Sequence, residues 1–124
     1  WAHLMLEELS GNEHMIIDGT PRSYEEALVL DTAITFYKRI SPVVIYIDVS
    51  KQWSKERLLS RASKEGRQDD QSMTKIETRL DWYDTEVMRA VKFFEQSNGY
   101  RFVHINGEQP IEKVAEDIQR ELAA

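Results

Sequence analysis

The stretch of this sequence that most constrains its fold is residues 15–22, which read MIIDGTPR. Three apolar residues closed by Asp18 are typical of a buried parallel strand, whose carboxyl end faces the crevice where open α/β sheets bind ligands. Gly19 and Pro21 then turn the chain sharply, and Arg22 leaves the turn as a forked cation suited to a phosphate. A strand, an acid, a turn and an arginine in this order indicate either one edge of a ligand site or an ordinary surface turn, since surface turns also collect Asp, Gly and Pro.

The rest of the chain alternates between helical and strand patterns. Strands are expected over Met15 to Asp18, Val43 to Val49 and Tyr100 to Ile105. Helices are expected over Ala2 to Leu9, from Tyr24 to about Arg39, after Ser50, from Ser72 to Gln96 and after Pro110. Strands that alternate with helices predict an α/β fold with a mainly parallel sheet, and 124 residues suit one domain over 1–124.

Apolar spacing gives an expected core. The β-branched run of residues 43–49 predicts a strand covered on both faces. The helical segments are expected to bury Ala27, Leu28, Val29, Leu30, Ile34 and Tyr37; Trp53, Leu58, Leu59 and Ala62; Met73, Ile76, Leu80, Tyr83, Val87, Val91 and Phe94; and Ile111, Val114, Ala115, Ile118 and Leu122.

Charge is unevenly distributed along the chain. The net charge is −6, yet residues 51–67 carry +4 and the remainder −10. Arg57, Arg61 and Lys64 follow i, i+4, i+7 spacing, so they share one helix face. That face is either simply solvated or binds an anion, and a local basic patch on an acidic protein suits a small anion better than a nucleic acid.

Several site classes and locations are disfavoured by composition. Without cysteine there is no disulfide or thiolate metal site, and His3, His14 and His104 lack the spacing of metal ligands. No apolar run approaches the roughly 20 residues of a membrane span, so no membrane partner is expected and a cytoplasmic location is the default. The first residue is Trp rather than Met, which suggests a fragment.

A second motif connects these features to a known family. Residues 66–70 read GRQDD, about 45 residues after DGTPR. The two segments in this order resemble the adenylate kinase family of nucleoside monophosphate kinases, whose motifs run Asp-Gly-Phe-Pro-Arg and Gly-Arg-x-Asp-Asp. The resemblance covers essentially the whole chain. It implies a P-loop-kinase-type sheet flanked by helices, a short lid at about residues 61–70, and Mg²⁺-dependent transfer of the γ-phosphoryl group of ATP to AMP or another nucleoside monophosphate.

The phosphate loop of such kinases is absent from these residues. It reads G-x-x-x-x-G-K-[ST], and none of the five glycines here precedes a lysine. By resemblance, the loop follows a first strand that lies between residues 15–18 and 43–49, which would otherwise stand about 10 Å apart. We therefore expect a missing N-terminal segment, a second chain or a rearranged element to complete the sheet, and the fragment alone to be inactive.

The resemblance also assigns roles to individual residues. Asp18 would order water around Mg²⁺, and Arg22, in the turn with Gly19, would grip the acceptor phosphate. Four arginines would neutralise charge on the transferring group, and two acids would hold them in place: Arg57, Arg61, Arg67 and Arg79, with Asp69 and Asp70. Arg57 and Gln109 would contact the donor nucleotide. Arg79 follows Asp70 at a spacing one residue longer than usual, and Thr20 replaces the Phe of the family.

Glu26 departs from the family, which usually has Gln here to bond the acceptor adenine. A carboxylate only accepts hydrogen bonds, so it would suit the N1–H and amino donors of guanine. Equally, Glu26 completes a capping box with Ser23. Two other functions stay open for the chain: a non-catalytic nucleotide-binding or assembly module derived from this fold, and a P-loop kinase for another small acceptor.

Overall fold

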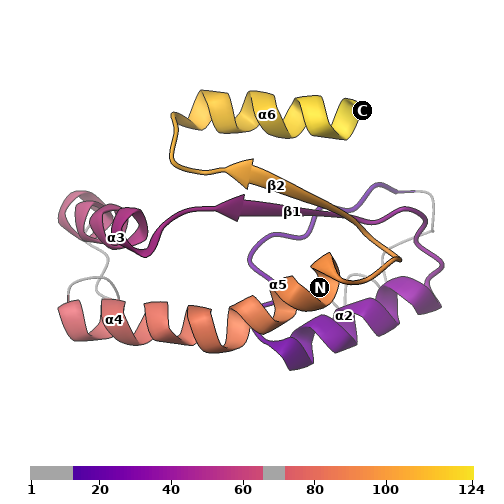
Figure 1. Ribbon diagram of the computed structural model, residues 1–124, viewed down its shortest axis with the longest axis horizontal. Helices are drawn as coiled ribbons and strands as arrows, with labels where there is room; N and C mark the ends of the chain where they lie inside the picture. Colours follow the sequence, from indigo (N-terminus) through magenta and orange to yellow (C-terminus); the bar gives the residue numbers. More distant parts are fainter. Residues whose placement is uncertain (1–12, 66–71) are drawn as a thin grey trace.

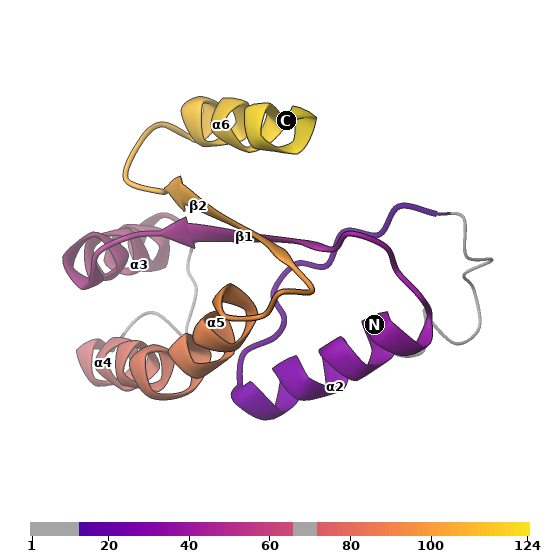
Figure 2. The same cartoon turned by 45° about the vertical axis from the view of Figure 1, so that its right-hand side comes forward.

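The computed structural model describes residues 13–65 and 72–124 (Figure 1). Its strands are β1 (Val43–Asp48) and β2 (Arg101–Asn106). Its helical elements are α2 (Tyr24–Phe36), α3 (Lys51–Glu65), α4 (Met73–Trp82), the π-helix η2 (Tyr83–Val87), α5 (Met88–Glu95) and α6 (Ile111–Ala123). Both views show α6 on one side of the strand pair and α2, α4 and α5 on the other (Figure 1, Figure 2). The expected α/β class is confirmed.

The two strands run parallel, in register from Val43 opposite Arg101 to Asp48 opposite Asn106. The chain between them passes through α3, α4, η2 and α5, as a parallel pair requires a long crossover. The expected parallel pairing is confirmed for these strands. Because both strands end at the same edge, the loops after Asp48 and Asn106 lie where parallel sheets usually bind ligands.

The strand predicted over Met15 to Asp18 is wrong, because these residues form no ladder. A strand needs a neighbour to accept its backbone N–H and C=O bonds, and no described strand pairs with this segment. Ile16 is 95% exposed, whereas Ile17 packs against the core. The turn that follows is therefore held by its own contacts rather than by a sheet.

The predicted covering of β1 on both faces is also wrong within the described part of the chain. Ile47 is 46% exposed, and Val43 is exposed as well. β2 borders one edge of β1, and no described strand borders the other. Within residues 13–65 and 72–124, β1 is therefore an edge strand rather than a central one, and part of its apolar run stays exposed.

The main core cluster joins α2 to α5 through Ala27, Leu30, Ala90 and Phe94. The prediction for Ala27 and Leu30 is confirmed. Leu28 and Val29 are exposed instead, because successive helical residues turn by about 100° and these two face away from that pair. The helix ends at Phe36 rather than near residue 39, since position 38 adopts a left-handed backbone conformation.

The single long helix predicted from Ser72 to Gln96 is confirmed, since α4, η2 and α5 follow one another directly. Ile76 and Phe94 are buried as expected, although Met73 is exposed. The middle turn is wider than an α-helix: the N–H of Met88 bonds the carbonyl of Tyr83, five residues earlier. Nothing in the apolar spacing indicated this π turn.

Helix α6 follows Pro110, as predicted, but its apolar face is not buried. Ile111 is 67% exposed, Leu122 and Ala115 are exposed too, and only Val114 and Ile118 are half-buried. The described sheet has two strands, so α6 packs against a narrow support along β2. Among the described residues, no helix is long and apolar enough to cross a membrane.

Candidate functional site

The turn that carries Arg22 is built on Gly19. Gly19 has φ of +78°, a left-handed conformation that glycine adopts without strain. Its carbonyl accepts a 2.7 Å hydrogen bond from Arg22 Nε, and a Cβ at position 19 would lie 3.2 Å from Arg22 Nη2. Glycine thus lets the guanidinium fold back over the turn, which orients it through Nε and leaves the Nη groups to bind a ligand.

Glu26 closes the same turn from the first turn of α2. Its Oε2 accepts the N–H of Arg22 at 2.6 Å and the hydroxyl of Thr20 at 3.2 Å. Ser23 Oγ accepts the N–H of Glu26 at 3.2 Å, so this half of the expected capping box is confirmed. In a complete capping box the Glu26 carboxylate would accept the N–H of the cap residue, Ser23. Here it accepts the N–H of Arg22, one residue before the cap. One carboxylate oxygen is engaged in the turn, which orients the other.

The turn is also tied to the long helix. Trp82, the last residue of α4, donates its indole N–H to the carbonyl of Arg22 at 3.3 Å. Trp82 lies 60 positions further along the chain, and its side chain is otherwise exposed. Sequence spacing offers no signal for such a contact.

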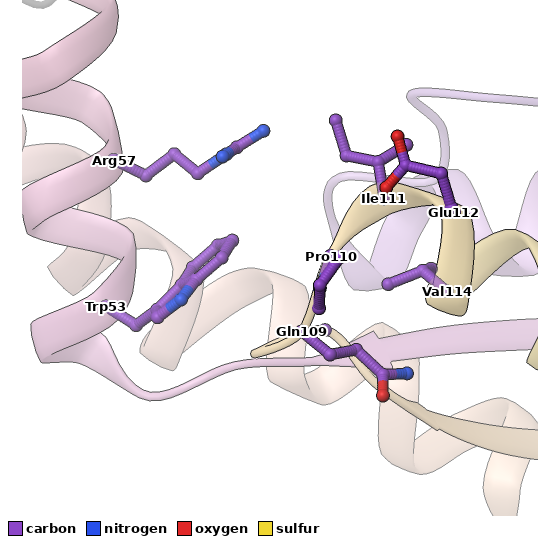
Figure 3. Close-up of a pocket in the computed structure, with 8 residues that line it drawn as sticks. Trp53, Arg57, Gln109, Pro110, Ile111, Glu112 and Val114 are labelled. Carbon is purple, nitrogen blue, oxygen red and sulfur yellow. The ribbon is translucent and has the colours of Figure 1, made fainter.

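A cavity of about 420 Å³ lies between α3 and the segment that joins β2 to α6 (Figure 3). Trp53 and Arg57 of α3 form one wall, and the other is formed by Gly107, Gln109, Pro110, Ile111, Glu112 and Val114. The Arg57 guanidinium lies 5.3 Å from the centre of the Trp53 ring, a cation–π contact that holds it at the cavity wall. The structure thus brings Arg57 and Gln109, both predicted for the donor nucleotide, to one cavity.

Hydrogen bonds near the carboxyl ends of β1 and β2 connect the two cavity walls. Gly107 donates its N–H to the carbonyl of Asp48 at 2.8 Å, so the β2–α6 loop continues the sheet contact. Glu108 Oε1 accepts the N–H of Ser50 at 2.6 Å, and Ser50 Oγ in turn caps α3 by accepting the N–H of Trp53 at 3.2 Å. The two hydrogen bonds join the loop to the first turn of the helix that carries Arg57.

Gln109 is held by α6 rather than by the opposite wall. Its side-chain amide donates to Asp117 Oδ2 at 2.8 Å, and the close-up shows it turned away from Trp53 (Figure 3). This bond from Gln109, with Lys113 and Arg120 nearby, holds the pKa of the Asp117 carboxyl below its usual range. A ligand in the cavity would therefore meet the backbone and aliphatic part of Gln109 more readily than its amide.

The remaining predicted residues are more scattered. Asp18 is exposed at the start of the turn, Arg61 is half-buried one turn beyond Arg57, and Arg79 is exposed near the end of α4. Arg67, Asp69 and Asp70, with most of the lid predicted at about residues 61–70, lie outside the described residues. The sequence pattern assigned Trp53 to the core, although the i, i+4 spacing of Trp53 and Arg57 could have indicated that their side chains pair. It did not identify Glu108 as a residue of the site.

No group of three or more histidine or acidic side chains within 13–65 and 72–124 converges as a direct metal site. A single exposed carboxylate such as Asp18 is compatible with Mg²⁺ held through water, because this ion keeps several of its waters in proteins.

Acid should weaken the link between the cavity walls. The hydrogen bond from Ser50 lowers the pKa of Glu108, so its stabilising effect is complete above the ordinary glutamate range and is lost as the pH falls through the lowered pKa. We expect Glu108→Gln to flatten the acid side of the stability profile, measured as urea midpoints between about pH 7 and about pH 3. Glu25→Gln, an exposed residue of α2, is the control; equal profiles for the two variants would contradict the link.

Comparison with known proteins identifies relatives that cover most of this chain. It is 30% identical over 110 residues to an adenylate kinase from Synechococcus sp. (strain JA-2-3B'a(2-13)), which covers 89% of this chain and 56% of that protein. It is 33% identical over 107 residues to an adenylate kinase from Leptospira biflexa (86% and 56%). It is 29% identical over 111 residues to UMP-CMP kinase 1 of Oryza sativa subsp. japonica (89% and 42%). No protein-family model matches.

The chain thus spans about 56% of the length of the curated adenylate kinases that it matches. The alignments with these proteins extend over 107 to 111 residues, which is 86 to 89% of this chain. The resemblance to the adenylate kinase family of nucleoside monophosphate kinases is thereby confirmed over most of this chain.

Proposed function

We propose that the protein to which these residues belong is a nucleoside monophosphate kinase, which transfers the γ-phosphoryl group of ATP reversibly to an acceptor monophosphate. The observation that carries this proposal is the cavity that Arg57 and Gln109 line from opposite walls, at the carboxyl edge of a parallel strand pair. The similarity of this chain to adenylate kinases and a UMP-CMP kinase also supports phosphoryl transfer between nucleotides. The single domain, the lid at about residues 61–70 and the cytoplasmic location remain predictions.

The donor base would bind in the cavity between α3 and the β2–α6 loop. A volume of about 420 Å³ suits a small organic ligand. The planar guanidinium of Arg57, already supported by Trp53, offers a stacking surface for an aromatic ring. Pro110 presents an apolar surface on the opposite wall (Figure 3).

The acceptor phosphate would bind at the Gly19 turn. Arg22 is oriented by the bond from its Nε to the Gly19 carbonyl, so its Nη groups can contact two phosphate oxygens at once. Preorganisation matters here because phosphoryl transfer depends mainly on positioning and charge stabilisation.

In the reaction, an oxygen of the acceptor phosphate forms a bond to the γ-phosphorus while the bond from that phosphorus to the β–γ bridging oxygen breaks, which releases ADP. Arg57, Arg61, Arg67 and Arg79 would neutralise the charge on the transferring group, and Asp69 and Asp70 would hold the lid cations. Mg²⁺, when bound near Asp18 through water, would supply further charge neutralisation on the phosphates. An N-terminal segment or a second chain would complete the sheet beside β1 and supply the phosphate loop.

The direct test is an assay of the full-length gene product with ATP and each of AMP, GMP, CMP and UMP. We expect nucleoside diphosphate to form with at least one acceptor. If none reacts while an ATP analogue still binds, the chain is a nucleotide-binding module and the kinase proposal is wrong.

Glu26 gives a specific prediction about the acceptor base. Its carboxylate accepts from the turn through Oε2, and the other oxygen can likewise only accept. It therefore suits guanine, whose N1–H and N2 amino group both donate, better than adenine, whose N1 is itself an acceptor. We expect GMP to be preferred over AMP, and Glu26→Gln to shift the ratio of kcat/KM towards AMP by about tenfold or more. Glu25→Gln is the matched control on the same helix turn. An unchanged ratio in Glu26→Gln would assign Glu26 to the turn alone.

A further inference from the structure

Three consecutive residues in the middle of the long helix each contact a different part of the chain that carries predicted site residues. They are Trp82, Tyr83 and Asp84, where α4 passes into the π-helix η2. Both cartoon views show this junction near the start of α2 (Figure 1, Figure 2).

The first contact reaches the acceptor turn. The Trp82 indole N–H donates to the Arg22 carbonyl at 3.3 Å. Arg22 is therefore bonded at three points: its N–H to Glu26, its Nε to Gly19 and its carbonyl to Trp82. The first two bonds lie within the turn, and the third fixes the turn to the long helix.

The second contact reaches the end of β1. The Tyr83 hydroxyl donates to the Tyr46 hydroxyl at 2.9 Å, and Tyr46 lies 3.4 Å from Asp48 Oδ1, to which it donates. Burial raises the pKa of Tyr46, and Tyr83 and Asp48 raise it further, so the phenol stays protonated and able to donate. The Asp48 carbonyl accepts from Gly107, where the cavity loop begins.

The third contact reaches the start of α3. Asp84 forms an ion pair with Lys51, the first residue of that helix. The bond raises the pKa of Lys51 above its usual value. Helix α3 carries Trp53 and Arg57, so this pair holds the cavity wall to the long helix, in addition to the Lys55 to Glu77 pair at 3.5 Å.

We propose that Trp82, Tyr83 and Asp84 are positioning residues that set the acceptor turn, the end of β1 and the donor wall of α3 relative to one another. This proposal rests on the kinase function proposed above. Consecutive residues on a helix point in directions about 100° apart, so a single turn can reach three neighbouring elements. The π turn is a local widening of a kind that often occurs at functional sites. Arg79 lies one turn earlier on the same helix, so the junction also sets its distance from Arg22.

The three contacts predict three separable effects in the full-length protein. Trp82→Phe should raise the KM for the nucleoside monophosphate about threefold to tenfold and leave the KM for ATP unchanged, because it removes the bond to the Arg22 carbonyl and leaves the contacts of Tyr83 and Asp84 in place. Asp84→Asn should raise the KM for ATP by a similar factor, because it releases the start of α3. Tyr83→Phe should lower kcat with smaller changes in either KM.

The matched control is Thr85→Val in the same π turn. Within the described part of the chain, the Thr85 hydroxyl donates inside the helix, to the carbonyl of Asp81 at 3.0 Å or that of Trp82 at 3.4 Å, and valine has the same shape. We expect Thr85→Val to keep both KM values and kcat. If the junction had only a structural role, every variant would have a lower thermal midpoint, and the KM for the nucleoside monophosphate and the KM for ATP would change together. That result would overturn the proposal.

A second measurement does not depend on catalysis. Amide hydrogen exchange should become about threefold to tenfold faster at residues 19–26 in Trp82→Phe and at residues 51–57 in Asp84→Asn, with neither change in Thr85→Val. If the wild-type protein transfers no phosphoryl group, the kinase proposal fails, while this exchange pattern still tests the junction. Exchange that changes equally in all variants, or in none, would refute the positioning role.

Discussion

Replacing Arg22 by methionine is expected to lower kcat/KM for the nucleoside monophosphate by about a hundredfold or more. The guanidinium is held over the turn by the Gly19 carbonyl, and its Nη groups would bind the acceptor phosphate through charge-assisted hydrogen bonds. Losing them removes the charge that faces the acceptor and the means of aligning it with the γ-phosphoryl group. Initial-rate kinetics with ATP saturating and the acceptor varied would measure the change.

Two further variants separate charge and geometry from general damage in this test. Arg22→Lys keeps the positive charge but lacks the planar guanidinium that can bind two phosphate oxygens. We therefore expect its kcat/KM to lie between those of Arg22→Met and the wild type. Arg101→Met removes an exposed arginine that pairs with Glu121 at the amino end of β2, far from the carboxyl edge, and should leave the kinetics unchanged. Equal rates for wild type and Arg22→Met would exclude Arg22 from acceptor binding.

The features that could be predicted from the sequence are those that depend on local spacing. The apolar positions of residues 72–96 step by three or four, and the helix that they predict runs from α4 to α5. Ser50 caps α3 as its position before that helix suggested. A helix satisfies its backbone within its own segment, so its sequence carries most of the information needed to place it.

Features that depend on distant partners could not be predicted in this way. Met15 to Asp18 has the composition of a strand, yet a strand exists only beside another strand, and no described residues pair with it. The second edge of β1 likewise has no strand neighbour among the described residues. The contact of Trp82 with Arg22 joins segments 60 positions apart, and no spacing rule relates them.

The candidate site falls between these two cases. On the donor side, the two residues predicted from the sequence, Arg57 and Gln109, line one cavity, because parallel strands bring the segments that follow them to one edge. The pairing of Trp53 with Arg57 follows helical spacing, but apolar patterning alone assigned Trp53 to the core. The distances among Arg22, Arg61 and Arg79 depend on helix packing, which single-residue patterns do not encode.

Gly107→Ala should be the most disruptive single-methyl change in the described cavity loop. A Cβ at position 107 would lie 2.5 Å from Val49 Cγ1, 2.7 Å from Ile47 Cγ2 and 3.2 Å from the Asp48 carbonyl. Val49 and Ile47 are β-branched and turn little about χ1, and the Asp48 carbonyl is backbone. The loop must therefore move, which breaks the 2.8 Å bond from Gly107 to Asp48. We expect unfolding free energy to fall by about 1–3 kcal/mol.

Gly99→Ala provides the matched control for that change, because the nearest atom to its added Cβ, Ser97 Oγ, would lie at an ordinary 3.7 Å. Its stability should change by no more than about 0.5 kcal/mol in urea denaturation. The same displacement predicts a functional difference: Gln109 and Pro110 lie two and three residues after Gly107 in the same loop, so Gly107→Ala should raise the KM for ATP while leaving that for the acceptor unchanged. A variant as stable as Gly99→Ala, with an unaltered KM for ATP, would mean that the loop is free to shift and that its contact with the end of β1 does not shape the donor cavity.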